Sequence, residues 1–258
     1  MILFFPALLT LLAQLVQLAP PPVPAADAKD KPHVVMVSAE DEYRTEKTLP
    51  VFAEKHLKAY RVSLVLADPK QPNHLPEIGK LKQADLLILS VRRRPLVEAD
   101  LAIVRAYVDS GKPIVALRTS SHAFAPKPGE TVPAGIASWE TFDRDVLGCH
   151  YTGHFSNKEK TKVTWSDKGR DHALAKGMKS DPFVSPSWLY KSLPLTEDCT
   201  VLQWGTVGEN PAQPVAWIRD KAKNRGRVFY TCLGHPGDFD LPPFVDLLKR
   251  GIDWAGEK

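Results

Sequence analysis

The chain has 258 residues and carries 34 basic and 30 acidic side chains, which gives a formal net charge of +4. This small charge is spread thinly, and Arg92, Arg93 and Arg94 form its only tight cluster. Because no basic stripe is interleaved with aromatic residues, the charge pattern argues against nucleic acid as a partner.

The N-terminal 26 residues predict an export signal. They contain no charged side chain, and the stretch Ile2–Leu18 is almost entirely apolar. Four prolines between residues 20 and 24 interrupt this segment before it reaches the roughly 20 apolar residues of a membrane span. An uncleaved N-terminal anchor is the alternative, since the segment lacks the usual Lys or Arg before its apolar run.

Cleavage near the small residues Ala25 to Ala28 would leave about 230 residues, a length that fits one large α/β domain. We therefore expect a signal peptide at residues 1–26, a linker at 27–32 and one folded domain at 33–258. The mature protein would be periplasmic or secreted, with no stable membrane span after cleavage.

Short apolar runs alternate with helical patterns in the first half of the domain. The runs are continuous rather than alternating, which predicts strands covered on both faces, as in a parallel, doubly wound sheet. The predicted strands are His33–Ala39, Val62–Leu66, Asp85–Val91 and Pro113–Leu117. The predicted helices are Glu46–Tyr60, a short helix near Pro76–Lys82, and Leu96–Asp109.

The second half is less regular. A long stretch, Ala123–Ser187, is interrupted by several prolines and glycines, and such insertions usually lie over the carboxyl ends of the strands, where ligands bind. After it we expect the strands Cys199–Trp204, Pro214–Arg219 and Arg227–Cys232, and a C-terminal helix, Phe244–Trp254.

Four segments carry a resemblance to a known family. They are Glu42–Arg44, Leu117–His122, Gly153–Phe155 and Gly226–His235, the last preceded by Pro214–Trp217. Together they resemble the ThuA-like (trehalose utilisation) branch of the class I glutamine amidotransferase-like proteins, over roughly residues 32 to 256. The resemblance implies a three-layer, doubly wound, mostly parallel α/β sheet of flavodoxin-like type. It also implies carbohydrate metabolism, with trehalose or keto-sugar derivatives as the substrate class.

The turn after the fourth predicted strand contains no cysteine, although related amidotransferases place their nucleophile there. The segment reads Leu117-Arg-Thr-Ser-Ser-His122. We therefore do not expect a cysteine amidotransferase. Ser120 or Ser121 beside His122 could serve as nucleophile and base, but adjacent side chains rarely face one another, and the turn lacks a Gly-x-Ser-x-Gly frame.

The three cysteines, Cys149, Cys199 and Cys232, are far apart in the chain and form no CxxC pair. Their spacing excludes a thiolate zinc site and a disulfide framework. Either one disulfide with one buried thiol or three buried thiols remain open, and we expect all three residues to be dispensable for activity.

Three histidines form the predicted catalytic centre. His122 and His235 each follow a predicted strand, and His154 lies in the insertion. If the strands are parallel, the three imidazoles can meet at the carboxyl edge, as a general acid/base pair or as ligands of a divalent metal such as zinc. No HExxH motif supports the metal, and the alternative is that these are hydrogen-bonded loop residues.

Charged side chains near the same edge complete the predicted site. Glu42 could orient an imidazole or act as the acid/base, and Asp238 could bind substrate. Asp238 and Asp240 also suit a helix start, and we favour capping for at least Asp240. Arg118 is the cation best placed for an anionic or polyhydroxy ligand, with an ion pair to Glu42 as the alternative.

Aromatic residues in or beside the insertion, above all Trp188, could stack on a sugar ring, although buried packing is the favoured explanation for such residues. We therefore expect a small carbohydrate as the ligand, bound by an enzyme or, alternatively, by a non-catalytic binding or interaction module. No sequence feature fixes the oligomeric state.

Overall fold

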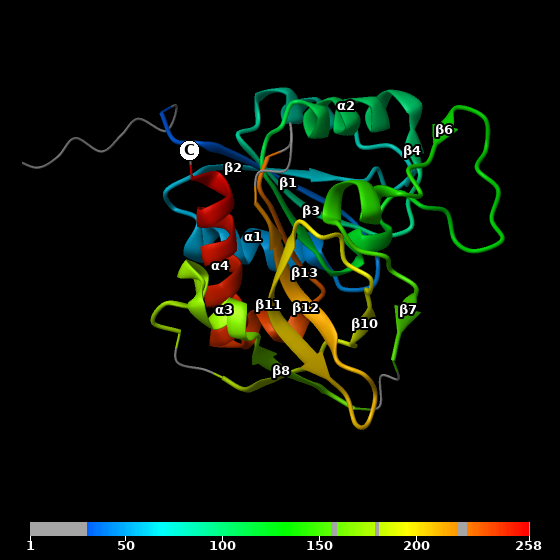
Figure 1. Cartoon of the computed structure of the whole chain (residues 1–258). Helices are drawn as coiled ribbons and strands as arrows, with labels where there is room; N and C mark the ends of the chain where they lie inside the picture. Colours follow the sequence, from blue (N-terminus) through cyan, green and yellow to red (C-terminus); the bar gives the residue numbers. More distant parts are fainter. Residues whose placement is uncertain (1–29, 156–158, 179–180, 221–225, 258) are drawn as a thin grey trace, which may run out of the picture.

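The computed structural model describes residues 30–155, 159–178, 181–220 and 226–257. The predicted signal peptide, residues 1–26, and the first part of the predicted linker lie outside these ranges. Within them, no helix has both the length and the apolar character needed to cross a membrane. At the centre is a nine-stranded sheet in the order β2-β1-β3-β5-β13-β12-β11-β8-β9 (Figure 1).

One half of the sheet is parallel, as its apolar runs predict. Neighbouring strands in the series β2-β1-β3-β5-β13 all pair in the parallel direction. Every residue of β1, β3, β5 and β13 is buried, which explains why these strands read as continuous apolar runs. The strands are β1 (His33–Ala39), β2 (Arg61–Leu66), β3 (Leu86–Val91), β5 (Ile114–Leu117) and β13 (Val228–Thr231).

The other half is antiparallel from β13 outward. It contains β12 (Gln213–Arg219), β11 (Cys199–Thr206), β8 (Thr161–Trp165) and β9 (Phe183–Ser185). The insertion therefore does more than cover the carboxyl ends, because it supplies β8 and β9 to the sheet itself. Burial alternates along β8, with Thr161, Val163 and Trp165 facing inward, so a short period-two pattern was the available signal.

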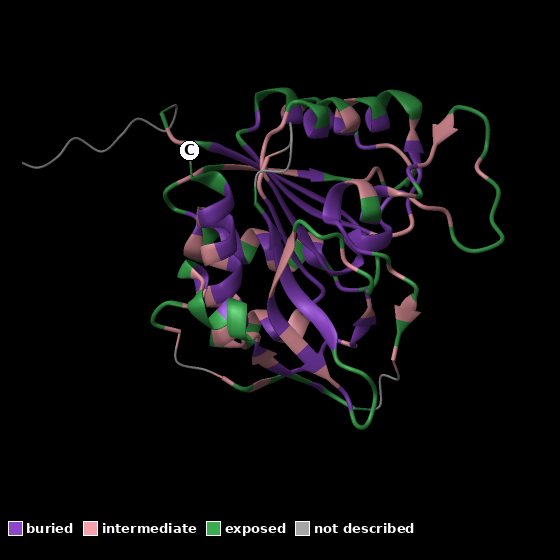
Figure 2. Ribbon diagram, in the orientation of Figure 1, coloured by how far each residue is buried: buried purple, intermediate pink, exposed green. Residues whose placement is uncertain are grey.

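Helices cover both faces of the sheet, which confirms the three-layer, doubly wound class (Figure 1). Helices α1 (Thr45–His56) and α4 (Pro242–Gly256) lie on one face and α2 (Glu98–Asp109) on the other. The predicted helix from Leu96 begins two residues late, because β4 (Leu96–Val97) pairs with β6 (Ile136–Ala137). Figure 2 shows the sheet and the inward helix faces buried and the outer helix faces exposed.

Helix α4 shows how the sequence sets this packing. Two prolines occupy its first turn, where their missing N–H groups cost no hydrogen bond. Its buried residues recur at helical spacing and form one apolar stripe. Within the stripe, a Cβ atom at Gly251 would lie 2.8 Å from the ring of Phe229, so glycine permits the close approach of α4 to β13.

Short elements fill the connections. The helical turns are η1 (Ile78–Gln83), η2 (Arg118–His122), η3 (Asp143–Leu147), α3 (Asp167–Asp171), η4 (Ala173–Ala175) and η5 (Pro236–Asp240). A separate pair, β7 (Gly153–His154) and β10 (Tyr190–Lys191), sets His154 opposite Tyr190. This pair belongs to the insertion and contributes to the cavity described next.

Candidate functional site

The carboxyl ends of β1, β3 and β5 deliver their loops to a cavity of about 390 Å³. Parallel strands bring these loops to one edge of the sheet. The insertion closes the cavity from the other side. Its lining residues are Glu42, Tyr43, Arg92, Arg93, His122, Tyr151, Gly153, His154, Trp188 and Tyr190.

His122 lies at the end of η2 and is the most deeply placed histidine of the cavity, 8% exposed. Its ring stacks on Tyr151 with 4.3 Å between centroids, and Nδ1 lies 3.1 Å from the Ser121 hydroxyl. Burial, together with the nearby arginines Arg93, Arg92 and Arg118, holds the pKa of His122 well below its usual value. The imidazole is therefore neutral at pH 7.

His154 reaches the same cavity from β7. Its ring centroid lies 4.7 Å from that of Trp188, and Nδ1 lies 2.8 Å from the Phe155 carbonyl oxygen. Unlike His122, this side chain is exposed. The structure thus brings together two of the three predicted histidines, one buried and one at the mouth.

His235 lies beside the cavity but does not line it. Its ring is edge-on to Tyr43, 6.1 Å between centroids, and Nδ1 accepts a hydrogen bond from the Gly237 N–H at the start of η5. Among the described residues, no group of three or more His, Cys, Asp or Glu side chains is arranged to hold a metal ion. His122, His154 and His235 therefore do not form the predicted zinc site in the described part of the chain, because His235 lies outside the cavity that the other two histidines line.

Asp238 serves the structure rather than the cavity. It is fully buried and accepts hydrogen bonds from the hydroxyls of Ser185 and Ser187 and from the N–H groups of Gly234 and His235. These bonds fasten the end of the insertion to the loop after β13, so a direct substrate contact by Asp238 is not supported.

The capping prediction for Asp240 is wrong. Asp240 ends η5, and the residue before α4 is Leu241, which makes no side-chain cap. The capping role belongs instead to Asp238, whose carboxylate bonds the N–H of His235 in a reciprocal capping box.

Arg118 occupies the strained turn directly after β5, with φ at 43°. It is 1% exposed, and its guanidinium carbon lies 3.9 Å from the centroid of Tyr43 and 5.0 Å from that of Tyr190. Nη1 of its guanidinium donates a hydrogen bond to the Cys232 carbonyl oxygen, while Nε and Nη2 have no partner at hydrogen-bond geometry among the described residues. Arg118 thus lies beneath the tyrosine rings that line the cavity, and not in its wall.

Glu42 does not pair with Arg118. Its carboxylate instead lies 2.7 Å from Nε of Arg92, and both side chains line the cavity. The ion-pair alternative considered for Arg118 is therefore not realised.

The serines of the turn are committed to the scaffold. The Ser120 hydroxyl donates to the Leu89 carbonyl oxygen at 2.8 Å, and Ser121 contacts both His122 and the Arg118 carbonyl oxygen. Ser121 and His122 do face one another, contrary to expectation. Ser121 is nevertheless only 2% exposed and does not line the cavity, so the geometry offers no accessible serine nucleophile.

The three cysteines are free thiols, two of them buried and Cys199 half-buried. Burial raises the pKa of each thiol. No cysteine lines the cavity, and none occupies the turn after β5. The open question of a disulfide is resolved in favour of three thiols, and the fold lacks the cysteine nucleophile of the amidotransferases.

Sequence reasoning did not assign Tyr43, Arg92, Arg93 or Tyr151 to the site. The two arginines directly follow β3, so the rule applied to His122, which follows β5, would have placed them at the same edge. Tyr151 lies in an irregular part of the insertion, where no periodicity points to its position.

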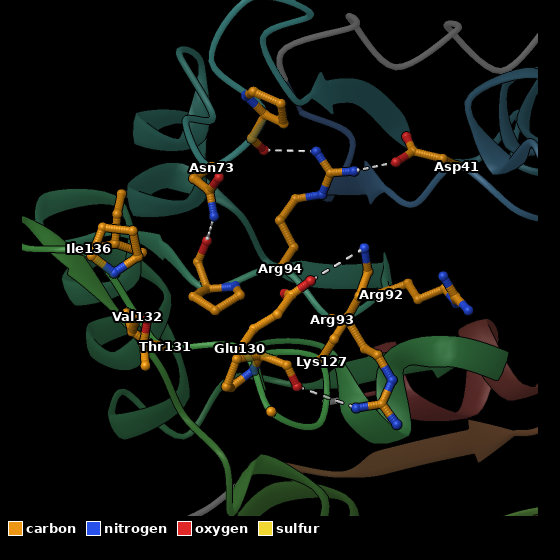
Figure 3. A pocket seen from close by; sticks show the side chains of 15 residues that line it. Asp41, Asn73, Arg92, Arg93, Arg94, Lys127, Glu130, Thr131, Val132 and Ile136 are labelled. Carbon is orange, nitrogen blue, oxygen red and sulfur yellow. Dashed lines mark hydrogen bonds and ion pairs between the residues drawn. The ribbon is translucent and has the colours of Figure 1, made fainter.

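A second cavity, of about 630 Å³, adjoins the first and shares Arg92 and Arg93 with it (Figure 3). The three consecutive arginines after β3 point in different directions there. Arg94 bonds Asp41 and the Pro72 carbonyl oxygen, whereas Arg93 extends toward the loop at 126–136.

Comparison with known proteins finds one matching family and several solved structures that share the fold. A family model described as ThuA, trehalose utilisation, matches residues 33–255. Among solved structures, a ThuA-like protein from Bacteroides uniformis has a TM-score of 0.62 at 16% identity, covering 91% of this chain and 95% of that protein. A ThuA-like protein from Parabacteroides merdae also has a TM-score of 0.62, at 15% identity, covering 88% of this chain and 90% of that one.

A β-galactosidase from Rahnella sp. R3 shares the fold more distantly. Its TM-score is 0.52 at 15% identity, and the match covers 86% of this chain but 30% of the galactosidase. No curated protein matches the sequence. At these identities the solved structures are evidence for the fold alone.

Proposed function

The chain belongs to the ThuA family, and from this membership and the geometry we propose that the cavity at the carboxyl edge binds a small carbohydrate and acts on it through His122. The family supports a role related to trehalose utilisation in general. The finer statement, that a trehalose or keto-sugar type substrate is bound in this cavity, rests on the residues described below.

The cavity wall suits a sugar. Trp188 is half-buried and offers an aromatic face, and a sugar ring presents the C–H groups that stack on such faces. Burial raises the pKa of Tyr43, Tyr151 and Tyr190, so their hydroxyls stay protonated at neutral pH and can donate as well as accept hydrogen bonds. The volume lies within the usual range for small-molecule sites.

The neutral, buried imidazole of His122 is the observation that carries the proposal. The Ser121 hydroxyl has one proton, and donating it to the Arg118 carbonyl oxygen leaves the Ser121 oxygen to accept from Nδ1–H of His122. Nε2 then carries a lone pair and has no hydrogen-bond partner among the described residues. At neutral pH this nitrogen is unprotonated and can accept a hydrogen bond or a proton from a substrate hydroxyl, and a bound anionic or proton-donating group would raise its basicity.

Two further groups can assist. His154 is exposed at the mouth, where its ring can hydrogen-bond a bound sugar, and Glu42 can fix the position of Arg92 in the wall. The turn after β5 contains no cysteine, and its two serines are buried. It therefore favours acid/base chemistry over a covalent intermediate.

The test is substrate turnover by the wild type and by His122→Gln, followed by NMR of trehalose and of its keto derivatives. We expect the substitution to lower turnover by about 100-fold or more while sugar affinity stays within a few-fold. His56→Gln, at the end of α1 and outside the cavity, is the matched control. Equal turnover in His122→Gln would remove the catalytic role.

A non-catalytic module is the second candidate. It is favoured by one observation, the absence of a cysteine from the turn Leu117–His122, where related amidotransferases place their nucleophile. Such a module would bind sugar without turnover, and its affinity would depend little on His122 or His154.

Export is part of the proposal. It is supported by the uncharged apolar segment at residues 1–26 and the small residues that follow. Mass spectrometry of the native protein should find a mature N-terminus between Ala26 and Lys31. Recovery of the intact segment on protein in the cytoplasmic fraction would contradict export.

A further inference from the structure

Three non-glycine residues among those described have a positive φ, and all three are arginines. They are Arg44 at 55°, Arg93 at 42° and Arg118 at 43°. Each lies in the loop after a parallel strand, β1, β3 or β5 respectively. Arginine has no intrinsic preference for this conformation, and strained backbone of this kind clusters at ligand sites. The carboxyl edge therefore holds cationic side chains at a conformational cost.

Within the described residues, two of the arginines around the cavity have no carboxylate partner. Arg92 pairs with Glu42, and Arg94 pairs with Asp41. Arg93, by contrast, has one side-chain hydrogen bond, from Nη1 to the Pro126 carbonyl oxygen at 3.2 Å. Arg118 is buried with two nitrogens unbonded. Proteins rarely bury a cation without a counter-charge, because desolvation is then uncompensated.

The other carboxylates beside this edge are already occupied. Glu130, which lines the larger cavity with Arg93, lies 3.6 Å from Nζ of Lys127. Glu40 accepts from the backbone N–H groups of Glu42, Tyr43 and Thr45 and from the Thr45 hydroxyl. The four bonds of Asp238, described above, likewise involve only hydroxyls and N–H groups. The described part of the chain therefore leaves positive charge uncompensated at the cavity. That excess also contributes to the lowered pKa of His122.

Arg93 is the cation a ligand can reach. It lines both cavities, and its guanidinium extends toward the loop at 126–136 (Figure 3). Arg118, by contrast, is covered by Tyr43 and Tyr190. A guanidinium binds the oxygens of a carboxylate or phosphate through paired N–H donors. Arg118 would add attraction from beneath without touching the ligand.

We propose that the ligand is an anionic carbohydrate, a sugar bearing a carboxylate or phosphate group, with the anion held by Arg93 and the ring in the smaller cavity beside His122 and Trp188. This inference rests on the proposed function and narrows its substrate class. A neutral sugar would leave both Arg93 and Arg118 uncompensated in the complex. An anionic sugar supplies the missing counter-charge.

The test is isothermal titration calorimetry at low salt with glucose, glucuronate and glucose 6-phosphate. We expect at least one anionic sugar to bind about 10-fold or more tightly than glucose. The two anionic arms identify whether a carboxylate or a phosphate is preferred, and inorganic phosphate alone measures how much affinity the anion supplies without the ring.

Substitution locates the anion. Arg93→Met should lower affinity for the preferred anionic sugar about 10-fold or more and leave glucose affinity within twofold, with Arg93→Lys intermediate. The matched control is Arg61→Met, because Arg61 is exposed at the amino end of β2, the opposite edge of the sheet. Circular dichroism checks folding of each variant. If Arg93→Met does not fold, two other measurements test whether the ligand's anion binds here. They are the affinity of Arg93→Lys and the salt dependence of the wild type, since only binding of an anionic sugar should weaken as salt rises.

The outcomes separate the two proposals. Equal affinity for glucose and both anionic sugars, or anionic binding unchanged by the Arg93 substitutions, overturns the anionic-substrate inference and leaves the proposed carbohydrate site standing. If neither these sugars nor trehalose and its keto derivatives bind, the proposed function itself fails. Binding of inorganic phosphate as tightly as glucose 6-phosphate would show that the ring contributes nothing, which also contradicts the inference.

Discussion

Two buried arginines, one in each half of the sheet, show how differently the halves use charge. Arg219, at the end of β12, is 8% exposed and donates two hydrogen bonds to Asp198, at 2.9 and 2.7 Å, and further bonds to the carbonyl oxygens of Asp145 and Val146. Arg118, at the end of β5, is 1% exposed and has one carbonyl partner and two tyrosine faces. The first arginine holds loops together, whereas the second keeps most of its bonding capacity unused.

The topology explains the difference. Parallel strands send all their following loops to one edge, so polar side chains collect there and can face a common cavity. Antiparallel strands alternate in direction and distribute their loops between both edges. Charges in the antiparallel half therefore find partners within the scaffold, and the parallel half can gather charges for a ligand.

The largest expected effect comes from substituting the two arginines in turn. Arg219→Met should lower the free energy of unfolding by about 2 to 3 kcal/mol, because it removes the hydrogen-bond donor of the partly exposed Asp198 carboxylate and of two carbonyl groups. Arg118→Met should cost less than about 1 kcal/mol, since it removes an uncompensated buried charge and fills the space with a side chain of similar volume. Urea denaturation measures both. A larger loss for Arg118→Met than for Arg219→Met would break the comparison.

A smaller effect is the pH dependence of the free energy of unfolding that His122 causes. The pKa of His122 is lowered by folding, so below about pH 6.5 the unfolded chain binds a proton at this position that the native protein does not. Stability should therefore fall as pH drops from 6.5, with His122 contributing a slope that approaches about 1.4 kcal/mol per pH unit.

The same comparison in His122→Gln isolates that contribution. Unfolding free energies measured between pH 7 and 5 should fall less steeply in His122→Gln than in the wild type. Identical slopes in wild type and His122→Gln would mean that the buried imidazole is protonated as readily as in the unfolded chain.

The smallest effect is at Trp188. Replacing it with alanine should weaken sugar binding by about 10-fold, the loss expected for one aromatic stacking surface, and Trp188→Phe should recover most of the affinity. Because the substitution also removes the fluorophore from the cavity, binding is measured by calorimetry rather than by tryptophan fluorescence. Unchanged affinity in Trp188→Ala would place the sugar elsewhere in the cavity.

Much of the parallel half was predictable, because its strands are buried on both faces and are therefore continuous apolar runs. Topology then placed Glu42 and His122 at one edge. Their surroundings were not predictable to the same degree. Arg118 adopts a left-handed backbone conformation that could not be predicted from its residue type. Its side chain consequently lies beneath the cavity rather than in the wall.

His235 illustrates a different limit. Its place after β13 was predicted, yet the hydrogen bond from Gly237 and the start of η5 draw its ring away from the cavity wall. A local cap of this kind depends on the loop backbone, which apolar periodicity does not describe. In the insertion, β8 and β9 are five and three residues long, too short for the pattern to stand out from the surrounding prolines.

The most direct test of the carboxyl-edge site is a crystal structure of the protein soaked with the sugar that binds most tightly in calorimetry. The account predicts a sugar ring within about 4 Å of Trp188 and a hydroxyl about 3 Å from Nε2 of His122. A sugar bound elsewhere, with the cavity at the carboxyl ends of β1, β3 and β5 left empty, would contradict it.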